Sequence, residues 1–300
     1  MRDETYGKKF RRIRKLKRLS LVKASTGVIS KSSLARWELG YDNLSWGNVL
    51  KLLDQNNIYP DEFIENSEIS YLGVNIKKIQ SAFVRGQTSL LKKYALDTLK
   101  SCKLDPLNER AFFEAAVACD LYKKHTNKSI CPKRVQVKLR LYFSNIIAEN
   151  DYWNYKNIFF FKNVVMLLNG KEAYKFSYDL LDYAKQENLE QSGFRHIVLQ
   201  ALLEATNTLI RKNIGYAKKI LFEVKSLIFS DYDSLEKIEI SFLDSAIKLI
   251  EEDETAELKA LYNVLDYLEM KDLKYHLENN IMILTKLYKN IEFDSQIWEK

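Results

Sequence analysis

The chain has 300 residues, of which only 9 are Gly and 3 are Pro. This length exceeds one typical domain, and the scarcity of turn formers disfavours sandwiches and barrels, so we predict an all-α protein with two domains. The net charge is +7, but residues 1–40 hold twelve Lys and Arg against three acidic residues, a surplus of +9, so the rest sums to −2. A basic segment of this kind favours a nucleic acid partner.

The first predicted element is a basic amphipathic helix over residues 6–18. Four apolar residues recur three or four positions apart, which puts them on one buried face: Tyr6, Phe10, Ile13 and Leu16. Cationic side chains fill the remaining surface, among them Lys8, Arg11, Arg12, Arg14, Lys15 and Arg18. Taken alone, such a face suits contact with water as well as contact with DNA.

Residues 19–40 have the pattern of two short helices joined by a tight turn. Ser20 is a good N-cap for the first helix, and Gly27 suits the turn that follows it. Ser30 is the N-cap of the second helix, which is predicted from Lys31 to Glu38. This order predicts a helix-turn-helix.

The second of these helices has a buried face and a polar face. Leu34 and Trp37 are three residues apart and are predicted to point into the core. The outward positions hold short polar and cationic side chains, which can reach base edges and phosphates in a major groove: Lys31, Ser32, Ser33 and Arg36.

Two further helices complete the predicted N-terminal module. Ser45 is the expected N-cap of a fourth helix, and Pro60 lies in the first turn of a short fifth helix. The fourth helix supplies apolar side chains that we expect in the core: Val49, Leu50, Leu52 and Leu53.

Together these motifs resemble the five-helix XRE or Cro/C1 type of DNA-binding module. The residues that carry the resemblance are Gly7-x-x-Phe10-Arg11-x-Ile13-Arg14, Leu19-Ser20 and Ser30-Lys31-Ser32-x-Leu34-x-Arg36-x-Glu38-x-Gly40. The segment Ile29-Ser30-Lys31-Ser32 is most similar to the Rgg/GadR/MutR regulators of Gram-positive bacteria. The sequence departs from the pattern at Leu21, Ala24 and Ser25.

The resemblance implies double-stranded promoter DNA as a partner and assigns roles by position. Lys31, Ser32 and Ser33 would meet base edges, and three arginines would hold phosphates: Arg11, Arg14 and Arg36. Arg36 has an alternative, since Glu38 or another carboxylate could pair with it on the surface. One recognition helix reads few base pairs, so we expect a homodimer on a palindrome.

A DNA-binding domain is therefore predicted over residues 1–65, a linker over 66–71 and a second domain over 72–300. Breaks in the helical pattern of the second domain predict about eleven helices joined by short connections. Short connections imply antiparallel hairpins stacked in sequence, which form a tetratricopeptide-like solenoid with a concave surface, although strict repeat signatures are not clear.

The second domain also has a segment similar to the Rgg family. Trp153-Asn154-Tyr155-Lys156-Asn157 followed by Phe159-Phe160-Phe161-Lys162-Asn163 is similar to a family pattern in which Gly and Glu stand where Asn154 and Asn157 stand here. Members of that architecture belong to the RRNPP quorum-sensing group and bind short signalling peptides on the concave face. The resemblance therefore implies a peptide-controlled transcription regulator.

Three residues of the second domain are candidate peptide contacts. The amides of Asn163 and Asn207 could pair with an extended peptide backbone, and Arg195 could neutralise a peptide carboxylate. Hydrogen bonds inside the protein remain the alternative for both amides, and contact with solvent remains the alternative for Arg195.

Other function classes find little support. The three histidines are isolated and no Gly-rich phosphate loop occurs, so we do not expect an enzyme. Three cysteines without C-x-x-C spacing favour a reduced, cytoplasmic protein with no metal or cofactor, and no apolar run is long enough for a membrane span. Two alternatives remain open: a stand-alone regulator without a peptide, and a helical-repeat scaffold that binds proteins.

Overall fold

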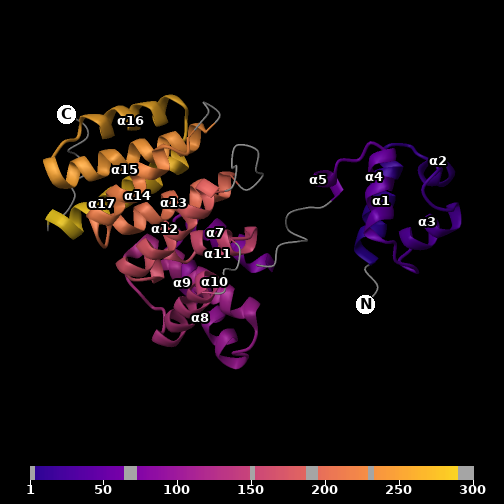
Figure 1. Ribbon diagram of the computed structural model, residues 1–300, viewed down its shortest axis with the longest axis horizontal. Helices are drawn as coiled ribbons and strands as arrows, with labels where there is room; N and C mark the ends of the chain where they lie inside the picture. Colours follow the sequence, from indigo (N-terminus) through magenta and orange to yellow (C-terminus); the bar gives the residue numbers. More distant parts are fainter. Residues whose placement is uncertain (1–3, 64–72, 149–152, 187–194, 229–232, 290–300) are drawn as a thin grey trace. The chain divides into compact units, whose positions relative to one another are not determined.

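The computed structural model divides the chain into two compact units, Met1–Ser70 and Tyr71–Lys300. It describes residues 4–63, 73–148, 153–186, 195–228 and 233–289. The linker predicted over 66–71 lies outside these residues. Figure 1 shows the helices of both units.

The N-terminal unit contains the five predicted helices. Ser20, Ser30 and Ser45 each accept a hydrogen bond from a backbone N–H three residues ahead, so these three predicted N-caps are confirmed. The helices are α1 (Glu4–Leu16), α2 (Leu21–Ser25), α3 (Lys31–Glu38), α4 (Trp46–Gln55) and α5 (Pro60–Phe63).

A small aromatic core holds this unit together. The ring of Phe10 packs against those of Trp37 and Phe63, with centroids 5.4 and 6.4 Å away. Trp37 and Leu34 are buried as predicted. Leu16 and Leu50 were expected in the core, but they are 73% and 40% exposed. Leu16 is the last residue of α1, where the helix leaves the core.

Helices α1 and α3 approach so closely that one position requires glycine. A Cβ atom built on Gly7 would lie 2.0 Å from the carbonyl oxygen of Trp37, which belongs to the backbone of α3. The absence of a side chain at Gly7 therefore sets the distance at which α3 packs on α1.

The described residues of the C-terminal unit contain eleven α-helices and one 3-10 segment. None of these helices is both long and apolar enough to cross a membrane. The elements are α7 (Gly73–Val84), α8 (Thr88–Leu104), α9 (Glu109–Thr126), α10 (Lys133–Ala148), α11 (Tyr155–Lys162), η1 (Val165–Leu167), α12 (Gly170–Gln186), α13 (Arg195–Ile210), α14 (Ile214–Lys225), α15 (Ser234–Glu252), α16 (Ala256–Tyr267) and α17 (Lys271–Lys289).

Most successive helices of this unit pack as neighbours, from α7 and α8 to α16 and α17, and α17 also contacts α9 (Figure 1). Near its middle, Phe143 stacks against Phe160 and Trp153, and the indole N–H of Trp153 donates to Asp179. The three cysteines are buried and form no disulfide. Burial of one helix face against the next is what holds such a stack together.

Helix α13 lies at the centre of the unit, in contact with α11, α12, α14 and α15. Most of its residues are buried, from Ile197 to Ile210. Polar side chains on this helix therefore lie inside the protein, where they need partners.

Candidate DNA-binding face and ligand cavity

The exposed N-terminal turn of α3 carries three of the predicted DNA contacts. Lys31 and Ser32 are exposed, and among the described residues none pairs with the Lys31 ammonium. The hydroxyls of Ser32 and Ser33 lie 2.9 and 2.8 Å from the Oγ of Ser30, the N-cap of the helix. The start of α3 thus presents a free cation beside a cluster of hydroxyls.

Arg14 does not have the exposed position that was predicted for a phosphate contact. Its side chain is buried, and its Nε and Nη2 donate to the two carboxylate oxygens of Glu38 at 2.6 and 2.7 Å. Its Nη1 donates to the carbonyl of Leu19 at 2.7 Å, and the bond to Glu38 raises the pKa of Arg14. Periodicity placed Arg14 on the polar surface, but it instead ties α1 to the end of α3.

The other two arginines remain near the surface. Arg36 forms a surface ion pair with Asp42, with its Nε 2.5 Å from the carboxylate. The alternative of a surface ion pair is therefore confirmed, but the partner is Asp42 and not Glu38. Arg11 is 43% exposed, and its Nε lies 4.0 Å from the carboxylate of Glu38. Arg11 is therefore accessible to a phosphate, whereas Arg36 must exchange its carboxylate to hold one.

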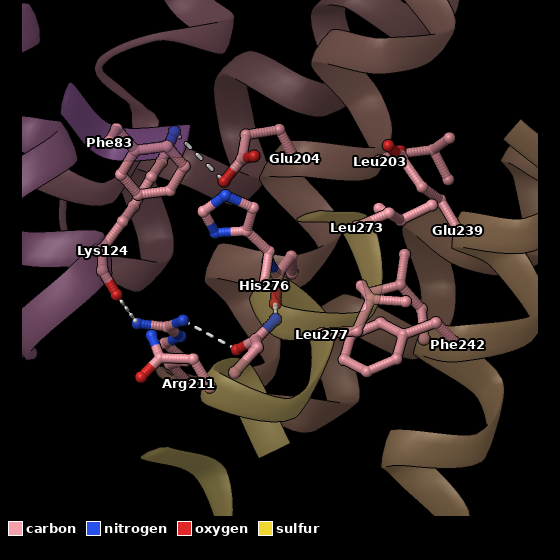
Figure 2. Close-up of a pocket in the computed structure, with 14 residues that line it drawn as sticks. Phe83, Lys124, Leu203, Glu204, Arg211, Glu239, Phe242, Leu273, His276 and Leu277 are labelled. Atoms are coloured by element: carbon pink, nitrogen blue, oxygen red, sulfur yellow. Dashed lines mark hydrogen bonds and ion pairs between the residues drawn. The ribbon is translucent and has the colours of Figure 1, made fainter. Parts of the chain in front are cut away.

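The C-terminal unit contains a cavity of about 230 Å³ (Figure 2). Its lining comes from α7, α9, α13, α15 and α17, and from Arg211 just beyond the end of α13. Apolar side chains form much of the wall: Phe83, Leu203, Phe242, Leu243, Leu273 and Leu277. An apolar cavity with a few convergent polar groups is typical of a ligand site.

A stripe of polar residues on α13 runs through this cavity. Glu204, Asn207 and Arg211 follow one another at helical spacing and line the wall. Asn207 accepts a hydrogen bond from the amide of Asn280 in α17 at 2.6 Å. Arg211 donates to the Oδ1 of Asn280 at 2.7 Å and to the carbonyl of Lys124 at 3.1 Å (Figure 2). The stripe thus joins α9, α13 and α17.

The ammonium of Lys124 pairs with two carboxylates beside the cavity. It lies 2.9 Å from Asp120 and 3.2 Å from Glu204, a contact that Figure 2 shows. Burial opposes its charge, but the two carboxylates outweigh that effect and raise the pKa of Lys124. For Asp120, burial outweighs the attraction of Lys124 and raises the pKa to about 6.

Burial also shifts the pKa of two other ionisable groups in the lining, Glu239 and Arg211. Burial, reinforced by Glu204, raises the pKa of Glu239 to about 7. Burial lowers the pKa of Arg211 to about 10, and its Nε has no hydrogen-bond acceptor. Charged groups that lack full compensation inside a cavity are candidates for ligand contacts.

The structure brings one of the three predicted peptide contacts to this cavity. Asn207 lines it, whereas Asn163 and Arg195 do not. Asn163 ends α11, where its Nδ2 donates to the carbonyl of Phe159 at 2.8 Å. Arg195 pairs with the buried carboxylate of Asp233, at the far end of α13 from Arg211. Both side chains therefore already have partners within the protein.

Within the part of the chain that the structure describes, one group of side chains has donor atoms close enough together to hold a metal ion. His196, Asp233 and Glu236 offer atoms within 4.8 Å of one another. However, Asp233 already accepts two hydrogen bonds from Arg195, and Glu236 lies 3.1 Å from the ring of His196. These contacts explain the cluster without a metal, so we assign none.

The polar stripe on α13 was visible in the sequence but was not recognised. Gln200, Glu204, Asn207 and Arg211 recur at four, three and four residues within an otherwise apolar helix. Such a stripe on a helix that is apolar all round indicates an internal polar site. The sequence-based prediction includes only Asn207 of these four residues, because the polar character of one residue does not reveal the face that it shares with the other three.

Comparison with known protein families gives one match over the C-terminal unit. The model for the C-terminal domain of the HTH-type transcriptional regulator Rgg matches residues 107–281, which is more than half of the chain. No curated protein matches the chain in sequence.

Solved structures share the fold of the whole chain. The SHP pheromone receptor Rgg2 of Streptococcus dysgalactiae is 17% identical, with a TM-score of 0.67 over 93% of this chain and 99% of its own. The PrgX/cCF10 complex is 14% identical, with a TM-score of 0.60 over 96% and 94%. PlcR of Bacillus thuringiensis, in complex with the peptide PapR7 and DNA, is 14% identical, with a TM-score of 0.56 over 92% and 99%. At these identities the likeness shows the fold.

Proposed function

Because the chain belongs to the family of HTH-type transcriptional regulators Rgg, we propose that its N-terminal unit binds promoter DNA and that its cavity binds a short signalling peptide. Peptide binding is supported by the polar stripe of α13, which lies among the apolar side chains of the cavity wall. The exposed start of α3 carries the DNA half.

On the DNA side, α3 is the recognition helix. Lys31 and Ser32 are exposed at its first turn, the part of such a helix that meets base edges. Arg11 contributes a phosphate contact from α1, and Arg36 joins it once the phosphate displaces Asp42. Arg14 acts indirectly, since its pair with Glu38 fixes α3 against α1.

We further propose that the regulator works as a homodimer, because a single helix reads too few base pairs for tight, specific binding. Two copies on a palindrome would double the contact. Since chromosomal DNA is the target, the protein acts in the cytoplasm, and no enzymatic step is part of its function.

On the ligand side, the cavity suits an extended peptide. The side-chain amides of Asn207, Asn279 and Asn280 line it beside leucine and phenylalanine side chains. Amides can pair with both the N–H and the C=O of a peptide backbone, and the apolar wall can accept hydrophobic side chains. Three solved proteins of this fold are described as a pheromone receptor, as a cCF10 complex and as a PapR7 complex with DNA.

A DNA selection tests the first half. The full-length protein is incubated with fragments of the genome that encodes it, and the bound fragments are sequenced. We expect enrichment of a palindromic site beside a promoter and loss of that enrichment in Lys31→Ala. Enrichment that persists unchanged in Lys31→Ala would contradict the role given to α3.

Calorimetry tests the second half. Short synthetic peptides from reading frames near the gene are titrated into the wild-type protein and into Asn207→Ala. Binding that weakens in Asn207→Ala is the expected result. If no peptide binds while DNA selection succeeds, the chain is a stand-alone regulator; if both fail, a protein-binding scaffold is the better description.

A further inference from the structure

The cavity has an acidic side that the proposed peptide contacts do not use. Glu239, on α15, lines the wall and is only partly exposed. Among the described residues, none forms a hydrogen bond or ion pair with its carboxylate. Figure 2 shows it on the side of the cavity formed with Leu203 and Leu273. A carboxylate in such a place normally has a partner.

The charged groups around Glu239 leave it undercompensated. From α13, Glu204 faces it, and from its own helix Glu236 adds a second negative charge. The cation whose charge acts on Glu239 is Lys162 of α11, and its ammonium lies 2.5 Å from the amide oxygen of Gln200. Lys124 also lines the cavity, but it is already shared between two other carboxylates. Carboxylates therefore outnumber the free cations on this side.

A group of opposite charge, the guanidinium of Arg211, also lines the cavity. Arg211 contributes a guanidinium whose Nε is buried without an acceptor. A cationic group of a ligand would pair with the carboxylate of Glu239, and an anionic group would be attracted by the positive charge of Arg211. A short peptide with free termini is the simplest molecule that carries both groups.

From this arrangement we infer that the cavity selects ligands with a protonated amine, and that Glu239 receives that amine. The amine is the peptide's amino terminus, placed with the apolar side chains against Phe242 and Leu273. The inference rests on the proposed peptide-binding function and adds to it the orientation of the peptide and a requirement for a free amino group.

The pKa of Glu239 fits this assignment. Burial and Glu204 raise it to about 7, so in the absence of a ligand the carboxyl is partly protonated at neutral pH. An ammonium group beside it would favour the ionised form. Binding of an amine then releases a proton from Glu239, whereas binding of an uncharged, acetylated terminus does not.

The test compares two synthetic pentapeptide libraries that are degenerate in Leu, Val, Phe and Ser. One library has free amino termini, and the other is acetylated at the same position. The full-length protein is incubated with each, and the retained peptides are measured by mass spectrometry. We expect about tenfold greater retention of the free-amine library, the size of a hydrogen bond to a charged group.

Two variants make the test specific. In Glu239→Gln the preference should fall to about one, with retention of the acetylated library unchanged. In Glu252→Gln, an exposed position on the same helix, the preference should remain. A thermal melt of each variant checks folding, and removal of an unpartnered carboxylate should not lower the melting temperature.

The outcomes separate this inference from the proposed function. Equal retention of the two libraries by the wild-type protein, or an unchanged preference in Glu239→Gln, would overturn the amine site while leaving peptide binding intact. Retention of neither library above a protein-free blank would overturn peptide binding in this cavity and the amine site with it.

Discussion

The two units place their charges in opposite ways. In the N-terminal unit most cations lie at the surface, and Arg14 is the buried exception, fully paired with Glu38. In the C-terminal unit Lys124 and Arg211 line a cavity, and Lys124 pairs with the fully buried carboxylate of Asp120. Exposed charge suits a polyanion of any sequence, whereas buried charge selects a ligand that completes it.

The contrast also shows what each charge does for the fold. A buried pair stabilises only while both partners are present, because an uncompensated ion in the interior is strongly destabilising. An exposed pair contributes little. Variants of the two kinds should therefore differ in stability in a predictable order.

The largest effect is expected at the buried pair of the N-terminal unit. Arg14→Met leaves Glu38 buried without its partner, so we expect the unfolding free energy of that unit to fall by about 3–5 kcal/mol. Urea unfolding followed by circular dichroism measures it. The double variant Arg14→Met with Glu38→Leu should recover much of the loss. A small effect in the single variant would mean that the pair does not fix α3.

The next largest effect concerns the contact between α1 and α3. Gly7→Ala puts a Cβ against the Trp37 carbonyl, so we expect a loss of about 1–3 kcal/mol. Gly47→Ala is the matched control, since nothing lies within 4 Å of its added Cβ, and it should stabilise α4 by up to about 1 kcal/mol. Equal effects at the two positions would show that the helices can separate without penalty.

In the C-terminal unit the informative variable is pH. The pKa of Glu239 is raised to about 7, so between pH 4.5 and 7 the folded chain holds a proton that the unfolded chain releases. Stability from this group is present at low pH and is lost as pH rises through 7. Glu239→Gln should therefore match the wild type near pH 4.5 and exceed it by about 1–2 kcal/mol at pH 8.

Thermal unfolding across this pH range measures the difference between the two proteins. A constant difference from pH 4.5 to 8 would mean that Glu239 does not titrate differently in the folded state. Glu252→Gln, at an exposed position on the same helix, should show no pH-dependent difference.

The smallest effect is expected at the exposed pair. Arg36→Ala removes the contact with Asp42 at the surface, and we expect a change in unfolding free energy of less than about 1 kcal/mol. Its affinity for DNA should fall nevertheless. A large loss of stability in Arg36→Ala would contradict the distinction between the buried and the exposed arginine.

Local patterns in the sequence predicted much of the fold. Ser20, Ser30 and Ser45 fixed three helix starts because capping depends on residues only three apart. Tertiary partners are not visible locally, which is why Arg14 was expected at the surface. Its periodic position is polar, but its partner Glu38 is 24 residues away.

The cavity was harder to predict for the same reason. Asn207 was identified as a candidate ligand contact, but its hydrogen-bond partner Asn280 is 73 residues away in the sequence. Glu239 looked like any carboxylate on an amphipathic helix, and only the packing of α13 against α15 brings it near Glu204. The energetics of such a group depend on its neighbours in space, which spacing along the chain does not reveal.

The most direct test of the division between the units is the salt dependence of DNA binding. Fluorescence anisotropy with a mixed-sequence duplex of about 30 base pairs would compare the full-length wild type, Arg11→Ala with Lys31→Ala, and Asn207→Ala. The account predicts that the double variant has a slope of log affinity against log salt shallower by about two, while Asn207→Ala keeps the wild-type slope. An unchanged slope in the double variant would contradict it.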